Sequence, residues 1–325
     1  MQLSPAGTPI VRTLNKGETL KIMEYSQDEM PSLAGTLITS DDPNKPIAVT
    51  VTEDLVHGDT SGDQIVPVGS LGTRYIVPRG YLDGRGKAGL VERFYLVATV
   101  PGTTVNVYTA TGTSSQISLS AAGDAARYTF PSGLYAVYVK SNYPVYVYQR
   151  TGYLEEGAAL LPSLYAIGQK QLSFYNTGAD MQAGALVFRK GAQSDFTISY
   201  GSTTAALSGS TYSVPNEPDW MVTRFNFPSA ANGKIVTIRN TQSPFSLGYV
   251  SSATGGNTPY GYFSAYSFEL PDTTYMCTVN PSVTLEVGYA MTYEWIFNGS
   301  VISTERTVTV TQEGEYTLVM NQDPT

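Results

Sequence analysis

The chain has 325 residues, a net charge of −8 and only 14% charged residues. This length permits two or three domains with a sizeable core, and the acidic balance argues against nucleic acid as a partner. The chain has one histidine, His57, and one cysteine, Cys277. A zinc site built from His and Cys alone is therefore excluded, and we expect no enzyme. Because no apolar run approaches 18 residues, we also expect no membrane insertion.

Three prolines recur at intervals of about one hundred residues, which is the size of a domain and too long for a solenoid repeat. Each proline opens a strongly alternating β pattern: Pro46, Pro144 and Pro244. A further segment of strand character precedes each one, at 36–40, 136–141 and 234–240. Two alternating segments separated by a few residues predict a β-hairpin around each proline. The sequence therefore predicts a duplicated β module with this hairpin at its centre.

Further matches between the copies set the boundaries of the predicted modules. Gly turns and Phe-Pro pairs recur at corresponding places, and the first copy lacks an opening strand pair. We expect a partial module at 1–72, a second at 73–168 and a third at 169–270. Helical signals are nearly absent, and for residues 154–161 we expect a loop with a turn of 3₁₀ helix. The fold class is predicted to be all-β, with tandem sandwich-like modules.

A Gly-rich connection that ends in a proline follows each predicted hairpin. These connections cover residues 58–67, 152–162 and 255–259. Connections of this kind lie on the surface and are free to vary in sequence. We expect any binding function to reside there.

Acidic residues surround His57 in the first of these connections. Asp54, Asp59 and Asp63 offer the oxygen ligands that Ca²⁺ prefers, but their spacing differs from that of an EF-hand. We favour a solvated acidic loop in which Asp63 and Gln64 cap backbone groups. No cofactor is expected, and calcium stays open as the alternative.

Trp220 lies in an insertion that the third module has and the second lacks. With Glu217 and Asp219 it could form a carbohydrate platform, because an indole offers rigid apolar area and carboxylates accept hydrogen bonds from hydroxyls. The favoured interpretation is that Trp220 packs over the edge of a sandwich.

The pattern of the sequence changes at residue 271, where a compact series of short strand segments begins. Four strand segments follow, at 282–287, 292–299, 306–310 and 314–319. Trp295 in the second segment, a turn at Asn298-Gly299 and Tyr316 near the end are typical of an immunoglobulin-like sandwich, in which the Trp fills the core and the Tyr lies at a corner. We therefore expect a separate small Ig-like domain at 271–325. The same Asn-Gly-Ser is an N-glycosylation acceptor, but we favour the turn.

Four segments carry a resemblance to a known family: Gly35–Ser40, Lys45–Val49, Asp63–Pro67 and Tyr75–Pro78. They resemble the N-terminal domain family named after the IgGFc-binding protein, and the resemblance covers residues 30–270. The segment 277–319 is similar to Ig-like or PKD-like modules of large secreted bacterial surface proteins, gliding-type adhesins among them. These resemblances imply an extracellular β module used in adhesion or display, without catalytic residues. In such modules a cysteine bridge is expected, so Cys277 is interpreted as one half of a disulfide whose partner lies outside this sequence.

We therefore expect a non-enzymatic segment of a secreted, bacterial cell-surface protein that acts in adhesion or as a structural module. Its partner would be a host or environmental glycan, a glycoprotein or another surface protein. The alternative is a carbohydrate-binding module of a larger secreted enzyme or adhesin. An enzyme using Glu155 and Glu156 is disfavoured, because adjacent acids in a strand point to opposite faces.

Overall fold

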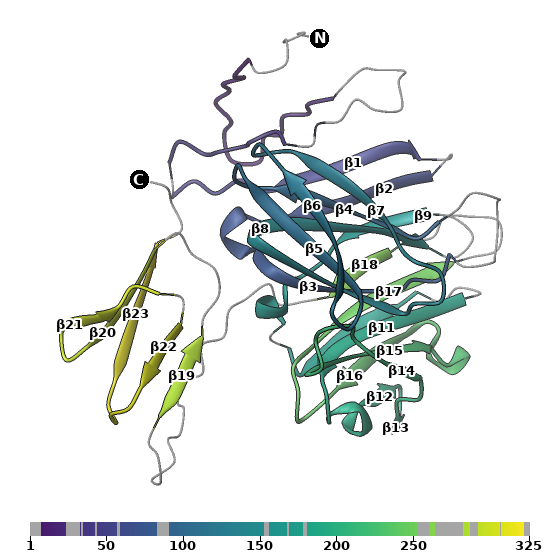
Figure 1. The fold of residues 1–325 in the computed structure, drawn as a ribbon. Helices are drawn as coiled ribbons and strands as arrows, with labels where there is room; N and C mark the ends of the chain where they lie inside the picture. The colour runs from purple at the N-terminus through teal and green to yellow at the C-terminus, as the bar shows by residue number, and fades with distance from the viewer. Residues whose placement is uncertain are drawn as a thin grey trace.

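The structure is a computed structural model that describes residues 8–23, 33, 35–42, 44–56, 59–82, 91–152, 156–167, 169–177, 181–252, 260–263, 282–286, 292–305 and 307–321. Within these ranges every regular element is a β strand or a three-residue 3₁₀ helix. The predicted all-β class is confirmed. Figure 1 shows sheets stacked in layers, followed by a C-terminal group of strands.

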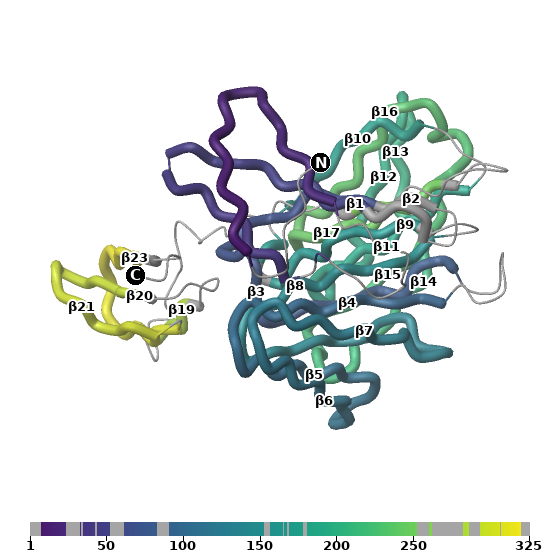
Figure 2. Tube along the Cα trace, turned by 90° about the horizontal axis from the view of Figure 1, so that it is seen from above, coloured from purple at the N-terminus to yellow at the C-terminus, as the bar shows by residue number. Residues whose placement is uncertain are grey.

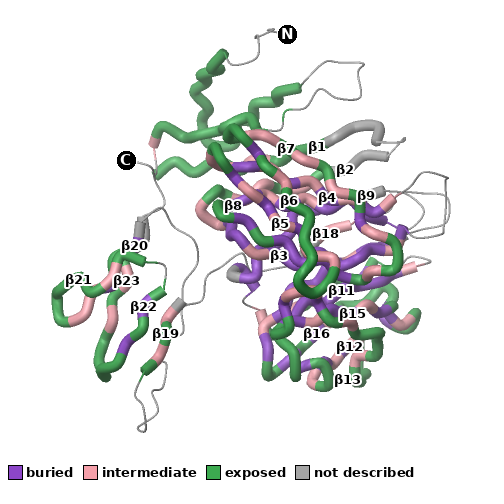
Figure 3. The backbone as a smooth tube through the Cα atoms, viewed as in Figure 1, coloured by how far each residue is buried: buried purple, intermediate pink, exposed green. Residues whose placement is uncertain are grey.

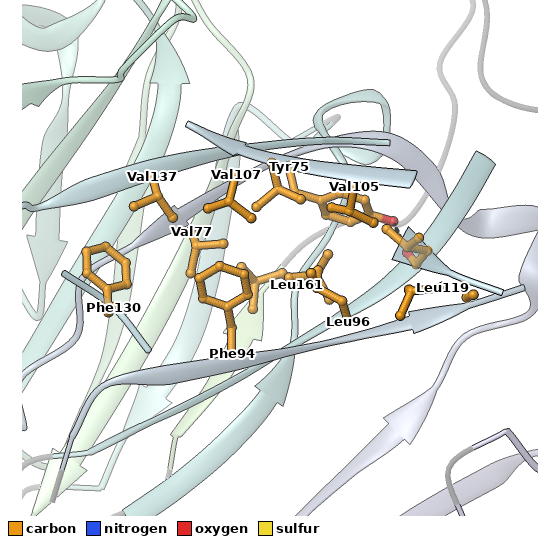
Figure 4. Packing of buried hydrophobic residues seen from close by; sticks show 14 residues of the cluster. Tyr75, Val77, Phe94, Leu96, Val105, Val107, Leu119, Phe130, Val137 and Leu161 are labelled. Carbon is orange, nitrogen blue, oxygen red and sulfur yellow. Dashed lines mark hydrogen bonds between the residues drawn. The ribbon is translucent and has the colours of Figure 1, made fainter. Parts of the chain in front are cut away.

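Seven strands form the first sandwich: β3 (Gly72–Pro78), β4 (Arg93–Ala98), β5 (Thr103–Ala110), β6 (Thr113–Leu119), β7 (Ala125–Thr129), β8 (Ala136–Gly152) and β9 (Glu156–Leu160). The long strand β8 belongs to both layers. Its first half pairs with β3 and β5, and its second half pairs with β4 and β9. Alternate residues point inward from these strands, as the core residues Phe94, Leu96 and Val107 do in Figure 4.

Nine strands form the second sandwich: β10 (Gln171–Asn176), β11 (Met181–Arg189), β12 (Thr197–Tyr200), β13 (Thr203–Ala206), β14 (Ser210–Ser213), β15 (Trp220–Asn226), β16 (Lys234–Arg239), β17 (Phe245–Ser252) and β18 (Tyr260–Phe263). One sheet has the order β10-β16-β12-β13, and the other has β14-β15-β11-β17-β18. The neighbours of β16 and β17 correspond to those of the two halves of β8. Phenylalanines dominate the core between these sheets.

The predicted β-hairpins around the three prolines are wrong. Pro144 lies inside the continuous strand β8, and Pro244 lies between β16 and β17, which belong to different sheets. Residues 36–40 form no strand before Pro46. In the two sandwiches the proline marks a crossover from one layer to the other. Alternation of apolar residues defines which face of a strand is buried, but not which strand it pairs with.

The N-terminal segment, defined as the described residues of 8–65, is organised differently. Strands β1 (Val49–Val56) and β2 (Asp59–Ile65) form a two-stranded sheet, and the 3₁₀ helix η1 (Val68–Ser70) follows. The described residues before β1 contain no strand, and Figure 3 shows them almost entirely exposed.

The stretch 154–161, expected to be a loop, contains strand β9. Residues 156–160 pair with the end of β8, and Ala158, Ala159 and Leu160 are buried. Burial in a sheet therefore overrides the helix-friendly composition. The 3₁₀ helix η2 (Leu164–Ala166) follows β9, and the described residues further along the chain form η3 (Gln193–Asp195) and η4 (Ser229–Ala231).

Five short strands form the C-terminal group: β19 (Val283–Glu286), β20 (Thr292–Phe297), β21 (Ser300–Ser303), β22 (Thr307–Val310) and β23 (Tyr316–Asn321). They make the sheets β19-β22 and β21-β20-β23. Trp295 is buried between them, and its Nε1 donates to the carbonyl oxygen of Glu305 at 3.0 Å. The Tyr316 hydroxyl donates to the carbonyl oxygen of Gln312 at 2.9 Å, which is the geometry of a tyrosine corner. Cys277 lies outside the described residues.

The turn between β20 and β21 has the expected residues. Asn298 and Gly299 both adopt positive φ, 51° and 75°, as a type I′ hairpin turn requires. The turn expected at Asn298-Gly299 is confirmed.

Candidate functional site

The predicted carbohydrate residues lie at the junction between the two sandwiches. We define the junction by the apolar cluster in which Ile76 and Tyr138 of the first sandwich meet Trp220 and Val222 of the second. Trp220 is only 3% exposed, and the Arg189 guanidinium carbon lies 4.4 Å from its ring centroid. A sugar platform needs an open ring face. The contacts of Trp220 give the carbohydrate prediction no support here.

An ion pair joins the two sandwiches beside this cluster. Arg74 of β3 donates from Nη2 to Glu217 Oε2 at 2.6 Å and from Nε to the Tyr138 hydroxyl oxygen at 2.9 Å. Tyr138 in turn stacks on Tyr108, with 5.6 Å between ring centroids. Burial raises the pKa of Tyr138 to about 12, and the Arg74 charge opposes that shift. Glu217 is therefore committed to a structural contact.

The segment around Glu217 makes a second contact across the junction. Asn216 adopts a positive φ of 57°, and its Oδ1 accepts a hydrogen bond from the backbone N–H of Gly112 at 3.3 Å. Gly112 lies in the turn between β5 and β6 of the first sandwich. Asp219 is exposed, and its backbone carbonyl accepts from the N–H of Lys190 at 2.8 Å. The insertion that carries Glu217, Asp219 and Trp220 thus fastens one sandwich to the other.

Aromatic residues close the opposite end of the junction. The Tyr81 hydroxyl donates a bifurcated hydrogen bond to the carbonyl oxygens of Gly184 and Phe225, at 3.0 and 3.1 Å. Arg224 covers the Tyr81 ring, with its guanidinium carbon 4.2 Å from the centroid, and donates to the carbonyl oxygen of Gly80. Burial raises the pKa of Tyr81 to about 12, while the Arg224 charge opposes the shift.

A stacked tyrosine pair extends this end. The ring centroids of Tyr135 and Tyr212, one from each sandwich, lie 4.0 Å apart. The Arg224 guanidinium carbon also lies 5.3 Å from the centroid of Tyr135. Apolar packing, an ion pair and aromatic contacts together hold the two sandwiches as one body.

Asp63, one of the three candidate calcium ligands, has a structural partner. Its Oδ2 accepts from the backbone N–H of Leu160 at 2.6 Å, and its Oδ1 accepts from the N–H of Gln64 at 2.7 Å. The carboxylate thus links β2 to the backbone of β9. His57 and the side chains of Asp54 and Asp59 lie outside the described residues. Among the side chains that the structure does describe, no group of three His, Cys, Asp or Glu is placed to hold a metal ion.

Three strand pairs adjoin along one side of the molecule. These pairs are β1-β2, the end of β8 with β9, and β17-β18. Strand β2 lies beside β9 (Figures 1 and 2). Strand β9 in turn lies beside β18. The Tyr146 hydroxyl donates to the carbonyl oxygen of Val66 at 2.8 Å, and the Tyr260 hydroxyl donates to Gln149 Oε1 at 2.9 Å. The connections predicted at 58–67 and 152–162 are wrong in large part, because they contain the strands β2 and β9. Residues 58 and 153–155 of these two connections, and the whole of the third at 255–259, lie outside the described residues.

The contact between the sandwiches was not predicted from the sequence, although Glu217 and Trp220 were singled out as candidate ligand-binding residues. Arg74 and Glu217 are 143 positions apart, and Arg224 lies 144 positions from Gly80. No local spacing links such residues. The only sequence signal was the insertion before Trp220, which drew attention to one side of the contact.

The comparisons with known proteins give one match. The family model described as IgGFc binding protein matches residues 1–249, which is more than half of the chain. No curated protein and no solved structure matches the chain. In the part of the chain that the structure describes, no helix has the length and apolar character needed to span a membrane. The chain therefore belongs to the IgGFc-binding protein family.

Proposed function

We propose that this chain is a non-enzymatic binding segment of a secreted cell-surface protein, which works in adhesion or display and takes another surface protein or a glycoprotein as its partner. Membership of the IgGFc-binding protein family, whose name is that of a binding protein, carries the proposal. The composition agrees with it, since one His and one Cys provide little material for catalysis.

The junction supports a display role. Two modules joined by a flexible linker would present their surfaces in changing relative orientations. Here the Arg74–Glu217 pair and the buried Trp220 fix one sandwich against the other. The three adjoining strand pairs can then present their connecting segments as one composite surface. Preorganisation of this kind lowers the entropic cost of binding.

The test is binding of the whole chain to three immobilised probes: a mucin, the same mucin after enzymatic deglycosylation, and an immunoglobulin G Fc fragment. We expect saturable binding to the mucin or to the Fc fragment. If the chain binds the mucin, it should bind the deglycosylated mucin as well. Replacement of residues 153–155 by Gly-Ser-Gly should weaken this binding by about tenfold. Absence of binding to all three probes would contradict the proposal.

The alternative, a carbohydrate-binding module, is favoured by one surface of the second sandwich. A row of hydroxyls crosses the exposed face of the sheet β10-β16-β12-β13, formed by Ser173, Thr237, Ser199 and Thr204. Beside it, Tyr175 and Ile235 are 62% and 65% exposed. An aromatic ring next to hydroxyls suits a sugar.

A glycan array separates this alternative from the main proposal. If the hydroxyl row binds sugars, Tyr175→Ala should abolish the signal, and Tyr143→Ala, which alters another exposed tyrosine, should leave it unchanged. Equal signals from both variants would remove the carbohydrate site.

A further inference from the structure

Arginines and tyrosines occupy the outer face of one sheet of the first sandwich. This sheet has the strand order β7-β4-β8-β9. Phe94 and Leu96 of β4 point into the core, so the residues that alternate with them point to the outer face. The register across β8, β4 and β7 gives two outward rows: Arg150, Arg93 and Thr129, then Tyr148, Tyr95 and Arg127.

Arg93 differs from the other arginines that are withdrawn from solvent. It is half-buried, and its Nε is inaccessible to solvent and has no hydrogen-bond acceptor. Within the described part of the chain, its side chain donates no hydrogen bond and forms no ion pair. By contrast, Arg74, Arg79 and Arg224 all donate to oxygen atoms of the protein. A guanidinium group that is partly desolvated without an acceptor costs free energy, and an anion from a partner would offset that cost.

The outer face carries positive charge without a described counter-charge. Arg150 is 7% exposed and lies directly opposite Arg93, and like charges at opposite positions destabilise a sheet. Among the described side chains of these four strands, none on the outer face is a carboxylate. The whole chain nevertheless has a net charge of −8. This face is therefore a local positive site on an acidic protein, and it is complementary in charge to an anionic ligand.

The β7 side of this face is accessible. Arg127 and Thr129 are exposed, and Tyr95 is half-buried. On the β8 side the Tyr146 hydroxyl donates to the carbonyl oxygen of Val66 at 2.8 Å, so the chain that leaves β2 covers that corner. A ligand would reach Arg93 from the side of β7.

We infer that this surface, which we call the arginine face and define by Arg93, Tyr95, Arg127 and Thr129, binds an acidic glycan. A sulfate or carboxylate group of the glycan accepts hydrogen bonds from the guanidinium groups of Arg93 and Arg127. The apolar side of a sugar ring packs on Tyr95, in the row next to Arg93 and about 7 Å away along the strand. Thr129 supplies a hydroxyl beside Arg93.

The position of these residues favours a glycan over an acidic peptide. The main-chain groups of β4 are paired with β7 on one side and β8 on the other. The face of the sheet therefore offers no main-chain hydrogen bonds, on which peptide recognition by sheets depends. Side chains alone make the contacts, as in sites for sugars. The proposed function, which rests on family membership, does not depend on this inference.

The test measures binding of the whole chain to four fluorescein-labelled probes by fluorescence anisotropy. They are the hexasaccharides of chondroitin sulfate and of hyaluronan, the neutral hexasaccharide of chitin, and a hexaglutamate peptide. At least one acidic hexasaccharide should bind saturably, at least about tenfold more tightly than the neutral one and less tightly as salt is added. Binding of chondroitin sulfate alone would assign the contact to sulfate, and binding of hyaluronan as well would show that a carboxylate suffices.

Two substitutions should remove the anion contacts. Arg93→Gln and Arg127→Gln should each weaken binding of the acidic hexasaccharide by about tenfold. Lys140→Gln serves as the matched control, because it removes a positive charge from an exposed position on the part of β8 that pairs with β3 and β5. This variant should bind as the parent does.

Thermal melting guards against misfolding of the variants. Because the Arg93 side chain donates no hydrogen bond within the described part of the chain, Arg93→Gln should not lower the melting midpoint. Arg127→Gln, at an exposed position, gives an independent reading. Three results would overturn the inference: equal binding by the parent and Arg127→Gln, equal binding of the neutral and acidic hexasaccharides, or tighter binding of hexaglutamate than of either acidic hexasaccharide.

Discussion

The strand that follows Pro144 and the strand that follows Pro46 have the same alternating pattern but different surroundings. Val145 and Val147 are 0% exposed, whereas Ile47 is 48% exposed. The second half of β8 has strands on both edges and a second layer beneath it, while β1 has one neighbour among the described strands. The pattern alone does not bury a strand. A two-stranded sheet gains its core only from further strands that pack on it.

The largest difference is expected from alanine substitutions at corresponding positions. Leu247→Ala, at a fully buried site in β17, should lower the free energy of unfolding by about 2–5 kcal/mol through the cavity that it leaves. Val49→Ala in β1 should change it by no more than about 0.5 kcal/mol. Urea unfolding followed by Trp220 emission in a Trp295→Phe background measures both. Similar losses at the two sites would contradict the difference in burial.

The next effect concerns the contact between the sandwiches. Arg74→Met leaves the Glu217 carboxylate largely buried without its cation, which should cost about 1–3 kcal/mol. Glu217→Gln should have a smaller effect, because the amide oxygen still accepts from Arg74. A double-mutant cycle on urea unfolding should show coupling between the two positions. Strict additivity would mean that the ion pair does not join the sandwiches.

Alkaline pH should weaken the junction before the N-terminal segment is affected. Burial raises the pKa of Tyr81 and Tyr138 from 10.0 to about 12, so the folded state keeps these protons when the unfolded chain has lost them. The stability that they contribute is fully present below pH 10 and is lost as the pH rises through about 12. Thermal melting should show a lower midpoint across this window, and Tyr81→Phe should flatten the decline. If the melting midpoint of the Tyr81→Phe variant falls as steeply with pH, the loss of stability must come from other groups.

The smallest effect is expected where the N-terminal segment contacts the first sandwich. Gly35 has a φ of 84°, and a Cβ at this position would lie 2.7 Å from the Cα of Gly123 in the turn before β7. Gly35→Ala should therefore displace the segment from that turn and speed amide exchange at Gly123, whose N–H donates to the carbonyl oxygen of Ala98. Global stability should change by less than about 1 kcal/mol. A large fall in the melting midpoint would show that the segment supports the sandwich more than its exposure indicates.

Local signals in the sequence predicted local structure well. Alternation located most strands, and the Asn298-Gly299 turn follows from the positive φ that a short hairpin demands. Such local signals could not predict which strands pair over long distances in the sequence. The residues around Pro244 are compatible both with a hairpin within one sheet and with a crossover to another sheet. The prolines of the two sandwiches therefore marked the strands correctly and their partners wrongly, and at Pro46 the preceding strand expected at 36–40 is absent from the described residues.

The junction was hidden for a different reason. Alternation predicts one buried and one exposed face, but Ile76 and Val222 point away from their own cores and are buried by the other sandwich. Their burial depends on a contact between modules, which no pattern within one strand records. Trp220 shows the same limit, since the sequence favoured its packing at the edge of a sandwich but did not indicate that the first sandwich covers it there.

Amide hydrogen exchange on the unmodified chain tests the central claim most directly. The account predicts that amides of β8 and β17 exchange slowly, as expected for paired strands in a core, and that residues 8–23 and 36–42 exchange at nearly unprotected rates. Equal protection of the N-terminal segment and the two sandwiches would contradict it.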